Sequence, residues 1–316
     1  MKDIIGYKKI EENLWQNFLA DKLHHCNLIT GEKGNGKANF VKEFAKKIIF
    51  KDRDRKQEIE SHPDILLISA KAHKKNAQEK ILIDDIREIK DFTNLSSGIS
   101  KNKIIIIDAI DNMNKNAFNA VLKTIEEPKS GVFIFLINHN IKNIPETIKS
   151  RCNIIKIKQF NFDYWSRIIR NQFHDISEQD LKNLYLISSN SIKEAIFLYQ
   201  NNWLDTYKNL IFSFTLSNEL EIINFCEKIS SAEINFDIFI KIMNLLLLRI
   251  VKIASFKKQD FILTEESLFQ NVNINMEKIF SIQDKINNLS QDIKIFNLDK
   301  KYFILNIILL IKTNLK

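Results

Sequence analysis

The seven residues Gly31–Lys37 limit the folds open to this chain more than any other segment. They match the pattern G-x-x-x-x-G-K and lie between an apolar run at Asn27–Thr30 and a helix-like segment at Ala38–Phe50. Glycines let a backbone wrap with its N–H groups directed at phosphate oxygens, and the helix that follows adds a favourable dipole. We therefore interpret the segment as a phosphate-binding loop whose Lys37 reaches the terminal phosphates. The alternative is a glycine-rich turn with a purely structural role.

Short apolar runs alternate with segments of helical period as far as about Ile157, a pattern typical of a parallel sheet flanked by helices. The third run contains four consecutive isoleucines, so we expect it to be covered on both faces and to be the centre of the sheet. The predicted class is therefore α/β. The predicted strands are Cys26–Thr30, Ile65–Ser69, Lys103–Asp108, Val132–Ile137 and Asn153–Ile157.

The strand pattern fades after Gln159, and helical periodicity dominates from Thr206 onward. Only 6 Gly and 3 Pro occur in 316 residues, which favours long uninterrupted helices. We predict a P-loop core over residues 1–158, a small helical domain over 159–205 and an all-α domain over 206–316. Short helices are predicted in the middle region at Tyr164–Phe173, Glu178–Ser188 and Ser191–Tyr199.

The charge of the chain favours a polyanionic partner. The 47 Lys and Arg residues exceed the 39 Asp and Glu residues and give a net charge of +8, which suits nucleic acid. A general abundance of Ile, Asn, Lys and Phe explains the same excess equally well. Phosphate contacts need only positive charge, although a solvated loop is the simpler interpretation of the densest cluster. The basic residues considered are Lys71, His73, Lys74, Lys75, Lys101 and Lys103.

The cysteines and the apolar segments predict a cytoplasmic protein. Cys26, Cys152 and Cys226 are far apart in the sequence and form no C-x-x-C pair, so we interpret them as reduced thiols. The N-terminus lacks the apolar run of a secretion signal. The longest apolar stretches, Met243–Leu248 and Tyr302–Ile311, are well short of the ~20 residues that span a bilayer.

Two alanines occupy positions where a working ATP site carries polar groups. Ala38 follows the loop lysine, where a Ser or Thr hydroxyl would bind magnesium. Asp108 could still hold the metal, but Ala109 follows it, where hydrolysing proteins place a glutamate that activates water. We expect weak nucleotide binding, or none, and hydrolysis that is absent or very slow. The alternative is that Asp111 or Glu126–Glu127 supplies the missing base.

Further motifs follow the loop in the order seen in one protein family. They are His62–Asp64, Ile83–Arg87, Ile104–Asp108, Asn119–Pro128 and Ser150–Cys152. On these residues the chain resembles the AAA+ clamp-loader subunits of bacterial DNA polymerase III, and among them the delta prime type. The segment Leu122–Pro128 and the Ser-Arg-Cys triplet are the most specific of these matches. The resemblance covers roughly residues 20–200, and the remainder is similar only in being helical.

The resemblance implies an AAA+ core, a helical lid and a C-terminal collar domain that joins a ring of five subunits. Motor subunits carry Ser or Thr after the loop lysine and Glu after the strand aspartate, so Ala38 and Ala109 indicate the non-hydrolysing position. The nucleotide-binding residues of this degenerate site would be Gly31, Gly34, Gly36, Lys37 and Asp108. Many relatives carry a four-cysteine zinc module, but residues 51–64 contain no Cys, so neither zinc nor another cofactor is expected to be required.

The resemblance also assigns roles outside the loop. Arg151, with Ser150 and Cys152, matches the arginine finger that acts in trans on a neighbour's ATP; the alternative is a surface arginine in an ordinary ion pair. Asn138 matches a residue that senses the γ-phosphate. The alternative is an asparagine with a structural role in a turn at the end of the strand. Lys193 stands where motor subunits carry an arginine, and a lysine lacks the fork geometry of that side chain.

The implied function is a stator that anchors the loader and supplies Arg151 to the adjacent motor subunit. The implied partners are the motor subunits (gamma or tau), the clamp-opening delta subunit and, through the complex, the sliding clamp and primed DNA, with no membrane. One alternative is a self-sufficient DNA-dependent AAA+ ATPase, such as a motor-type subunit. The other is a basic nucleic-acid-binding protein with a vestigial loop.

Overall fold

The computed structural model describes residues 6–50, 59, 62–71, 80–95, 98–215, 218–231, 236–255, 265, 276–296 and 299–314. The chain divides into two compact units. The first runs to Ile168 and includes Ser191–Lys193, and the second comprises Ile169–Asn190 and Glu194–Lys316. The three-domain division remains a prediction.

The first unit is built on a parallel sheet of five strands in the order β2-β3-β4-β1-β5. The α/β class is confirmed, but the predicted centre is wrong. The isoleucines of β3 are fully buried, yet β4 is the middle strand. An isoleucine run shows burial on both faces, which holds for any interior strand, and does not reveal the strand order. The strands are β1 (Cys26–Thr30), β2 (Ile65–Ser69), β3 (Lys103–Asp108), β4 (Val132–Asn138) and β5 (Asn153–Lys156).

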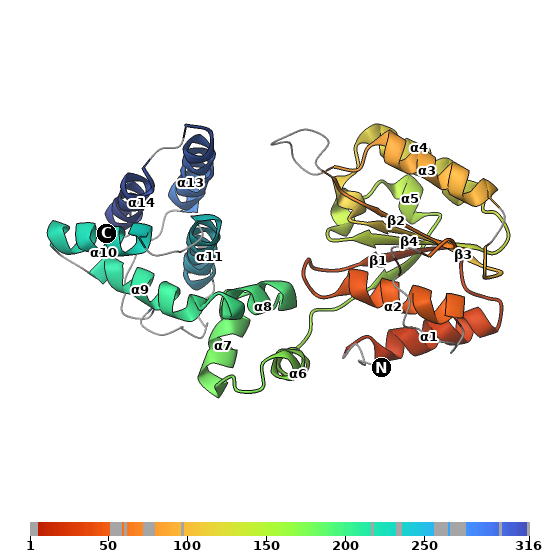
Figure 1. The fold of residues 1–316 in the computed structure, drawn as a ribbon, viewed down its shortest axis with the longest axis horizontal. Helices are drawn as coiled ribbons and strands as arrows, with labels where there is room; N and C mark the ends of the chain where they lie inside the picture. Colours follow the sequence, from red (N-terminus) through yellow and green to blue (C-terminus); the bar gives the residue numbers. More distant parts are fainter. Residues whose placement is uncertain are drawn as a thin grey trace. The chain divides into compact units, whose positions relative to one another are not determined.

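Helices cover both faces of this sheet (Figure 1). One face carries α1 (Lys8–Leu19) and α2 (Lys37–Phe50), and the other carries α3 (Ile83–Asn94), α4 (Lys115–Glu126) and α5 (Glu146–Lys149). The apolar residues of α3 and α4 pack against Ile105 and Ile107 of β3 in one buried cluster. This two-sided cover explains why the strands are apolar throughout and do not alternate.

The strand register brings polar residues to one edge of the sheet. Thr30, the last residue of β1, lies opposite Asn138, the last residue of β4. On the other side of β4, Ile107 lies opposite Leu136, so Asp108 ends β3 at the same edge. Ligands of open α/β sheets bind outside this carboxyl edge.

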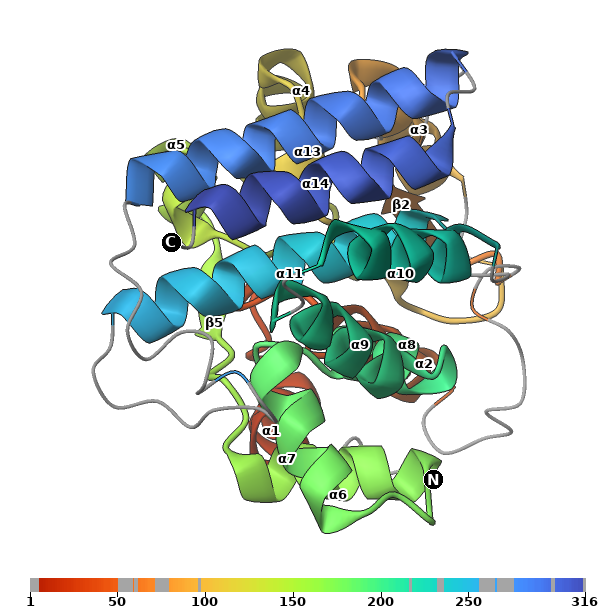
Figure 2. The ribbon, with the colours of Figure 1, turned by 90° about the vertical axis from the view of Figure 1, so that its left-hand side faces the viewer.

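The second unit is helical in its described part (Figure 2). Helix α14 packs against α9, α10 and α13, and α13 packs against α11. A buried ion pair between Arg249 and Glu265, at 2.7 Å, is completed by the Tyr207 hydroxyl, which donates to Glu265. The helices are α6 (Phe162–Gln172), which leads in from the first unit, α7 (Glu178–Ile187), α8 (Ile192–Gln200), α9 (Trp203–Thr215), α10 (Glu219–Ser231), α11 (Phe236–Ser255), α13 (Met276–Phe296) and α14 (Lys300–Asn314).

Within the described residues, no helix has both the length and the apolar character needed to cross a membrane.

Candidate functional site

The loop after β1 depends on glycine at two positions. Gly34 and Gly36 have φ angles of +87° and +82°, in the left-handed region that other residues rarely adopt. A Cβ atom at Gly34 would lie 2.0 Å from the hydroxyl oxygen of Ser191. The same loop position meets Lys193, whose backbone N–H donates to the Gly34 carbonyl at 3.0 Å. The segment Ser191–Lys193 therefore rests on the loop as part of the first unit.

Lys37 is buried at the base of the loop, with 2% of its surface exposed. Its ammonium donates to the carbonyl oxygens of Gly31 and Glu32 at 2.7 and 2.6 Å. Burial lowers its pKa to about 8, although the nearby carboxylates of Asp111, Asp108 and Glu32 act in the opposite direction. The loop thus holds a cation at the carboxyl edge of the sheet, where a phosphate would need one.

Asn138 is held from two sides. Its Oδ1 accepts a hydrogen bond from the Thr30 hydroxyl at 2.9 Å, and its Nδ2 donates to the Asp111 carboxylate. The backbone N–H of His139 donates to the same carboxylate at 2.7 Å. Asp111 therefore anchors the end of β4, which does not favour it as a free general base. The sensor role of Asn138 remains a prediction.

The residues at this edge fit a phosphate better than they fit magnesium. The glycine loop and the buried Lys37 are the groups that would hold an anion, and Asp108 is one half-buried carboxylate at the end of β3. Ala38, in the first turn of α2, offers no hydroxyl, and Ala109 offers no carboxylate. Ala109 also has a φ of +63°, a strained conformation for an alanine. The metal-binding half of the site is incomplete.

Tyr7 supports the loop, a role that the sequence did not predict. Its buried hydroxyl donates to the backbone oxygen of Asn35 at 2.8 Å, and its ring stacks on Phe40 with centroids 4.6 Å apart. Burial raises the pKa of this hydroxyl. Tyr7 contacts the loop from a distant part of the chain, and no local pattern marks it.

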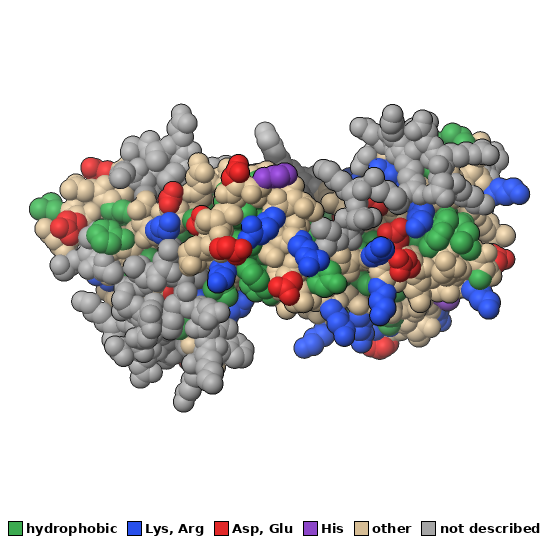
Figure 3. Space-filling model, turned by 90° about the horizontal axis from the view of Figure 1, so that it is seen from below, with side chains coloured by type: hydrophobic (Ala, Val, Ile, Leu, Met, Phe, Trp, Pro, Cys, Tyr) green, Lys and Arg blue, Asp and Glu red, His purple; other side chains and the backbone are tan. Residues whose placement is uncertain are grey.

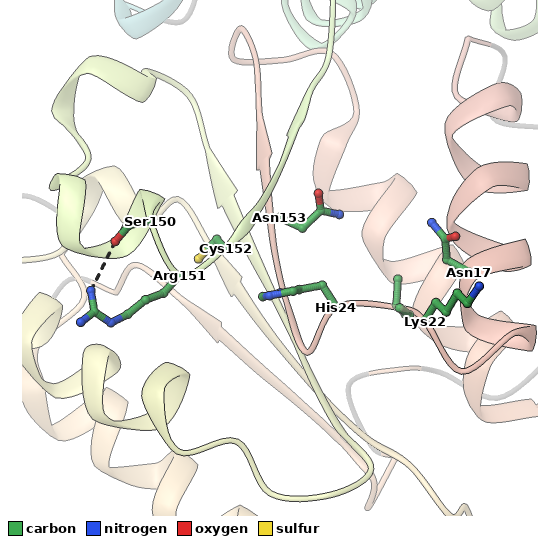
Figure 4. Close-up of a pocket in the computed structure, with 8 residues that line it drawn as sticks. Asn17, Lys22, His24, Ser150, Arg151, Cys152 and Asn153 are labelled. Atoms are coloured by element: carbon green, nitrogen blue, oxygen red, sulfur yellow. Dashed lines mark hydrogen bonds between the residues drawn. The ribbon is translucent and has the colours of Figure 1, made fainter.

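Arg151 follows α5 and is 41% exposed. Its Nε lies 2.8 Å from Oε1 of Glu126, and its Nη1 donates to the Thr147 carbonyl at 3.0 Å and to the Ser150 hydroxyl at 3.3 Å (Figure 4). The ordinary ion pair considered from the sequence is therefore present. It also holds the guanidinium in one orientation at the surface.

Arg151 and the loop lie at opposite edges of the sheet. Strands β1 and β5 run parallel, with Asn27 opposite Asn153, so Arg151 precedes β5 at the amino edge. The loop follows β1 at the carboxyl edge. Five residues of strand at about 3.3 Å each put roughly 16 Å between these edges. This geometry keeps Arg151 away from the nucleotide site of its own chain.

A pocket of about 400 Å³ lies beside Arg151 at the amino edge. It is lined by Ser150, Arg151, Cys152 and Asn153 from the segment before β5, and by Asn17, Lys22, Leu23 and His24 from the opposite side. Figure 4 shows Cys152 and His24 among the residues that line the pocket. His24 Nδ1 forms a hydrogen bond of 2.7 Å with the Cys26 carbonyl oxygen, and the His24 ring stacks on His25.

Two of the three cysteines are neighbours, contrary to the impression that the sequence gives. The sulfur atoms of Cys26 and Cys152 lie 3.1 Å apart, and both thiols are free. Cys226 is the third free cysteine and belongs to the other unit. The pairing of β1 with β5 brings Cys26 and Cys152 together across 126 positions of sequence.

The basic residues considered as DNA contacts have different surroundings. Lys103 is buried and donates to the carbonyls of Phe92 and Leu95 at the end of α3, each at 2.6 Å, so it is wrong to count it as a DNA contact. Lys71 is exposed and lies 3.9 Å from Asp85, whereas His73, Lys74 and Lys75 lie outside the described residues. On the face in Figure 3, basic and acidic side chains are interspersed.

No metal centre is formed by the described part of the chain, where three or more His, Cys, Asp or Glu residues never come close enough to share an ion. The expectation that zinc is not required remains a prediction, because part of residues 51–64 lies outside the described residues.

Comparison of the sequence with known proteins finds subunits of DNA polymerase III. A family model described as DNA polymerase III, delta subunit, matches residues 6–161. The DNA polymerase III subunit gamma of Buchnera aphidicola subsp. Schizaphis graminum is 29% identical over 213 residues, which cover 63% of this chain and 57% of that protein. The subunit delta' of Pseudomonas aeruginosa is 32% identical over 92 residues, 29% of this chain and 27% of that protein.

A solved structure shares the fold. The DNA polymerase III gamma subunit-related protein of Thermotoga maritima superposes with a TM-score of 0.50 and 22% identity, over 98% of this chain and 100% of that chain. The chain spans little more than half the length of the gamma relatives that it matches, 57% and 58% for the two Buchnera proteins.

Proposed function

The chain belongs to the AAA+ clamp-loader family of bacterial DNA polymerase III, and we propose that it is the non-hydrolysing delta prime type of subunit. In this role it would anchor the loader and supply Arg151 to the ATP site of an adjacent motor subunit. The complex as a whole would use ATP to place the sliding clamp on primed DNA.

The position of Arg151 carries this proposal. The side chain is exposed, it is oriented by Glu126, and it lies at the sheet edge opposite the loop of its own chain. An arginine so placed can reach a γ-phosphate only on another subunit. A guanidinium there stabilises the charge that develops on the transferring phosphoryl group and is worth ~10³–10⁵ in rate for arginine fingers in general.

The chain's own loop supports the non-hydrolysing half of the proposal. Ala38 and Ala109 remove the magnesium hydroxyl and the water-activating carboxylate, and Asp111 is engaged by Asn138 and His139. If ATP binds, Lys37 and the loop amides would hold its phosphates, and Asp108 would be the remaining carboxylate near magnesium. Binding without turnover is the behaviour that these residues favour.

The partners follow from the same proposal. A finger that acts in trans requires a motor subunit, of the gamma or tau type, at the amino edge of the sheet. The delta subunit, the sliding clamp and primed DNA would be met through the complex. Stable association with motor subunits is expected without DNA.

The second candidate is a motor-type subunit that hydrolyses ATP itself. The relatives named gamma favour it, because they match 63% of the chain at 29% and 28% identity. This candidate predicts DNA-stimulated hydrolysis by the purified chain that is lost in Lys37→Ala. The delta prime proposal predicts no such turnover.

The test is clamp- and DNA-stimulated ATP hydrolysis by the loader reconstituted with this chain or with Arg151→Ala. We expect a fall of tenfold or more, which corresponds to at least ~1.4 kcal/mol of transition-state stabilisation. Arg170→Ala is the matched control, because Arg170 is 39% exposed and also pairs with a glutamate, Glu178. Gel filtration must show equal assembly. Unchanged hydrolysis by an intact Arg151→Ala complex would overturn the trans role.

A further inference from the structure

The two thiols at the amino edge have the geometry of a reactive pair. Cys26 begins β1, and Cys152 directly precedes β5. Because Asn27 lies opposite Asn153, the register places Cys26 opposite Cys152 on neighbouring strands. Such strands lie about 4.8 Å apart, within the Cα separations of about 4.4–6.8 Å that a disulfide accepts. Their sulfur atoms are already 3.1 Å apart, so only a small side-chain movement separates the thiols from a bond.

The two thiols differ in access. Cys26 is fully buried, whereas Cys152 is half-buried and lines the pocket of about 400 Å³. A small oxidant can therefore reach Cys152 through the pocket, while Cys26 has no exposed surface and does not line the pocket. This is the arrangement of an attacking thiol with a resolving thiol behind it.

The electrostatics agree with this division of roles. The pKa of Cys152 is lowered because the Cys26 thiol donates a hydrogen bond to its thiolate, although burial opposes this shift. The pKa of Cys26 is raised well above its ordinary value by the same hydrogen bond and by burial. Since the thiolate is the reactive form, Cys152 reacts first.

We propose that Cys26 and Cys152 are a site of reversible oxidation that takes a peroxide as its substrate and forms a cross-strand disulfide. The Cys152 thiolate attacks one peroxide oxygen, the O–O bond breaks, and Cys152 sulfenic acid and one water form. The Cys26 sulfur then attacks the Cys152 sulfur and expels the second water. The two thiols lose two electrons and two protons in total, and the peroxide is reduced to two waters. A dithiol reductant reverses the step.

The disulfide would restrain the position of the triplet Ser150–Cys152, which contains Arg151. It would tie the residue after Arg151 covalently to β1 and close a loop across 126 positions of the chain. Constraint of so long a loop limits the unfolded ensemble, so the oxidised chain should unfold at a higher temperature than the reduced chain. The thiol chemistry itself does not depend on the proposed function, because it requires only the folded chain.

The test exposes the reduced full chain to hydrogen peroxide and follows its intact mass and a peptide map. We expect a mass lower by two hydrogens, a cross-link between Cys26 and Cys152, and complete reversal by dithiothreitol. The Cys226→Ala variant should behave like the parent chain, because Cys226 is not part of the pair. The Cys26→Ala variant should stop at a Cys152 sulfenic acid that a dimedone probe captures.

Several results would overturn the proposal. These are a sulfenic acid that accumulates on Cys152 of the parent chain without a cross-link, a cross-link that includes Cys226, and a disulfide between two chains. The same holds if Cys152 fails to react at least about tenfold faster than Cys226, since the proposal requires Cys152 to be the more reactive thiol. The peptide map of the oxidised parent chain distinguishes these results even if a variant does not fold.

Discussion

Arg151 Nε lies 2.8 Å from Glu126 Oε1, and this ion pair joins the second residue after α5 to the last residue of α4. Both side chains are more than two-fifths exposed, at 41% and 45%. Exposed pairs of this kind contribute roughly 0–1 kcal/mol to stability because water and salt screen them. The pair therefore matters for the orientation of Arg151 more than for the stability of the fold.

The Glu126→Gln variant separates these two effects. We expect its free energy of unfolding in urea to change by less than about 1 kcal/mol. In the reconstituted loader, hydrolysis should fall about two- to tenfold, because the guanidinium loses the charge that orients it. Glu178→Gln, which removes the partner of Arg170, is the matched control and should leave hydrolysis unchanged. Equal losses in both variants would refute an orienting role for Glu126.

The strained backbone after β3 gives a second prediction. Ala109 has φ +63° and ψ +65°, a left-handed conformation that costs about 1–2 kcal/mol for a residue with a Cβ. Ala109→Gly should raise the free energy of unfolding by about 0.5–1 kcal/mol, after the greater freedom of glycine in the unfolded chain is counted. Ala120→Gly, within α4, should instead lower it by about 1 kcal/mol. Chemical denaturation of both variants checks the opposite signs, and equal destabilisation would contradict the prediction.

The strands were predictable because each is an apolar run bounded by polar residues, and three of the five have the predicted bounds. The loop was predictable because its glycines are spaced for a phosphate and lie between a strand and a helix. The strand order was not, since local composition carries no record of which strand pairs with which. The sequence therefore does not reveal that β4 is the middle strand, nor that Cys26 lies next to Cys152.

Charged residues were harder to assign than apolar ones. Lys103 looks like a surface lysine in the sequence, yet it satisfies the carbonyl oxygens at the end of α3. The motif marks the arginine of the triplet, but its partner Glu126 depends on a contact between α4 and the segment that follows α5. Contacts between distant segments set the surroundings of each charge, and a sequence pattern does not contain them.

Asp64 gives a prediction about acid stability. Burial raises its pKa, but backbone N–H groups of Ser100, Ile99 and Gly98 donate to its carboxylate at 2.7–2.8 Å and bring the pKa below its ordinary value of 3.8. The folded chain therefore binds fewer protons here than the unfolded chain, and the stabilisation is complete above about pH 4 and is lost as the pH falls further. The carboxylate thus contributes to stability near neutral pH and loses that contribution in acid.

The test compares Asp64→Asn with the parent chain by urea unfolding at neutral and acid pH. At pH 7 the variant should be less stable by about 2–4 kcal/mol, because backbone donors lose a charged acceptor. The difference should shrink as the pH falls below about 4, because the unfolded parent chain then takes up a proton on Asp64 that the folded chain binds less readily. Asp84→Asn, which changes a carboxylate whose side chain is 77% exposed, should cost less than about 1 kcal/mol. A loss for Asp64→Asn that is the same at both pH values would contradict the carboxylate's role.

Lys37 gives a pH dependence of the same sign as Asp64 but in the alkaline range. Burial lowers its pKa from 10.5 to about 8, so between these values the unfolded chain binds more protons than the folded chain. The free energy of unfolding of the parent chain should therefore rise through this window relative to Lys37→Met, which has no proton to lose there. We expect the difference between the two chains to change by about 1–3 kcal/mol from pH 8 to pH 10.5. Lys33→Met, at an exposed position of the same loop, controls for the loss of one charge. A difference that stays flat across the window would show that the Lys37 ammonium is not destabilised by burial, and the loop would then hold its cation without cost.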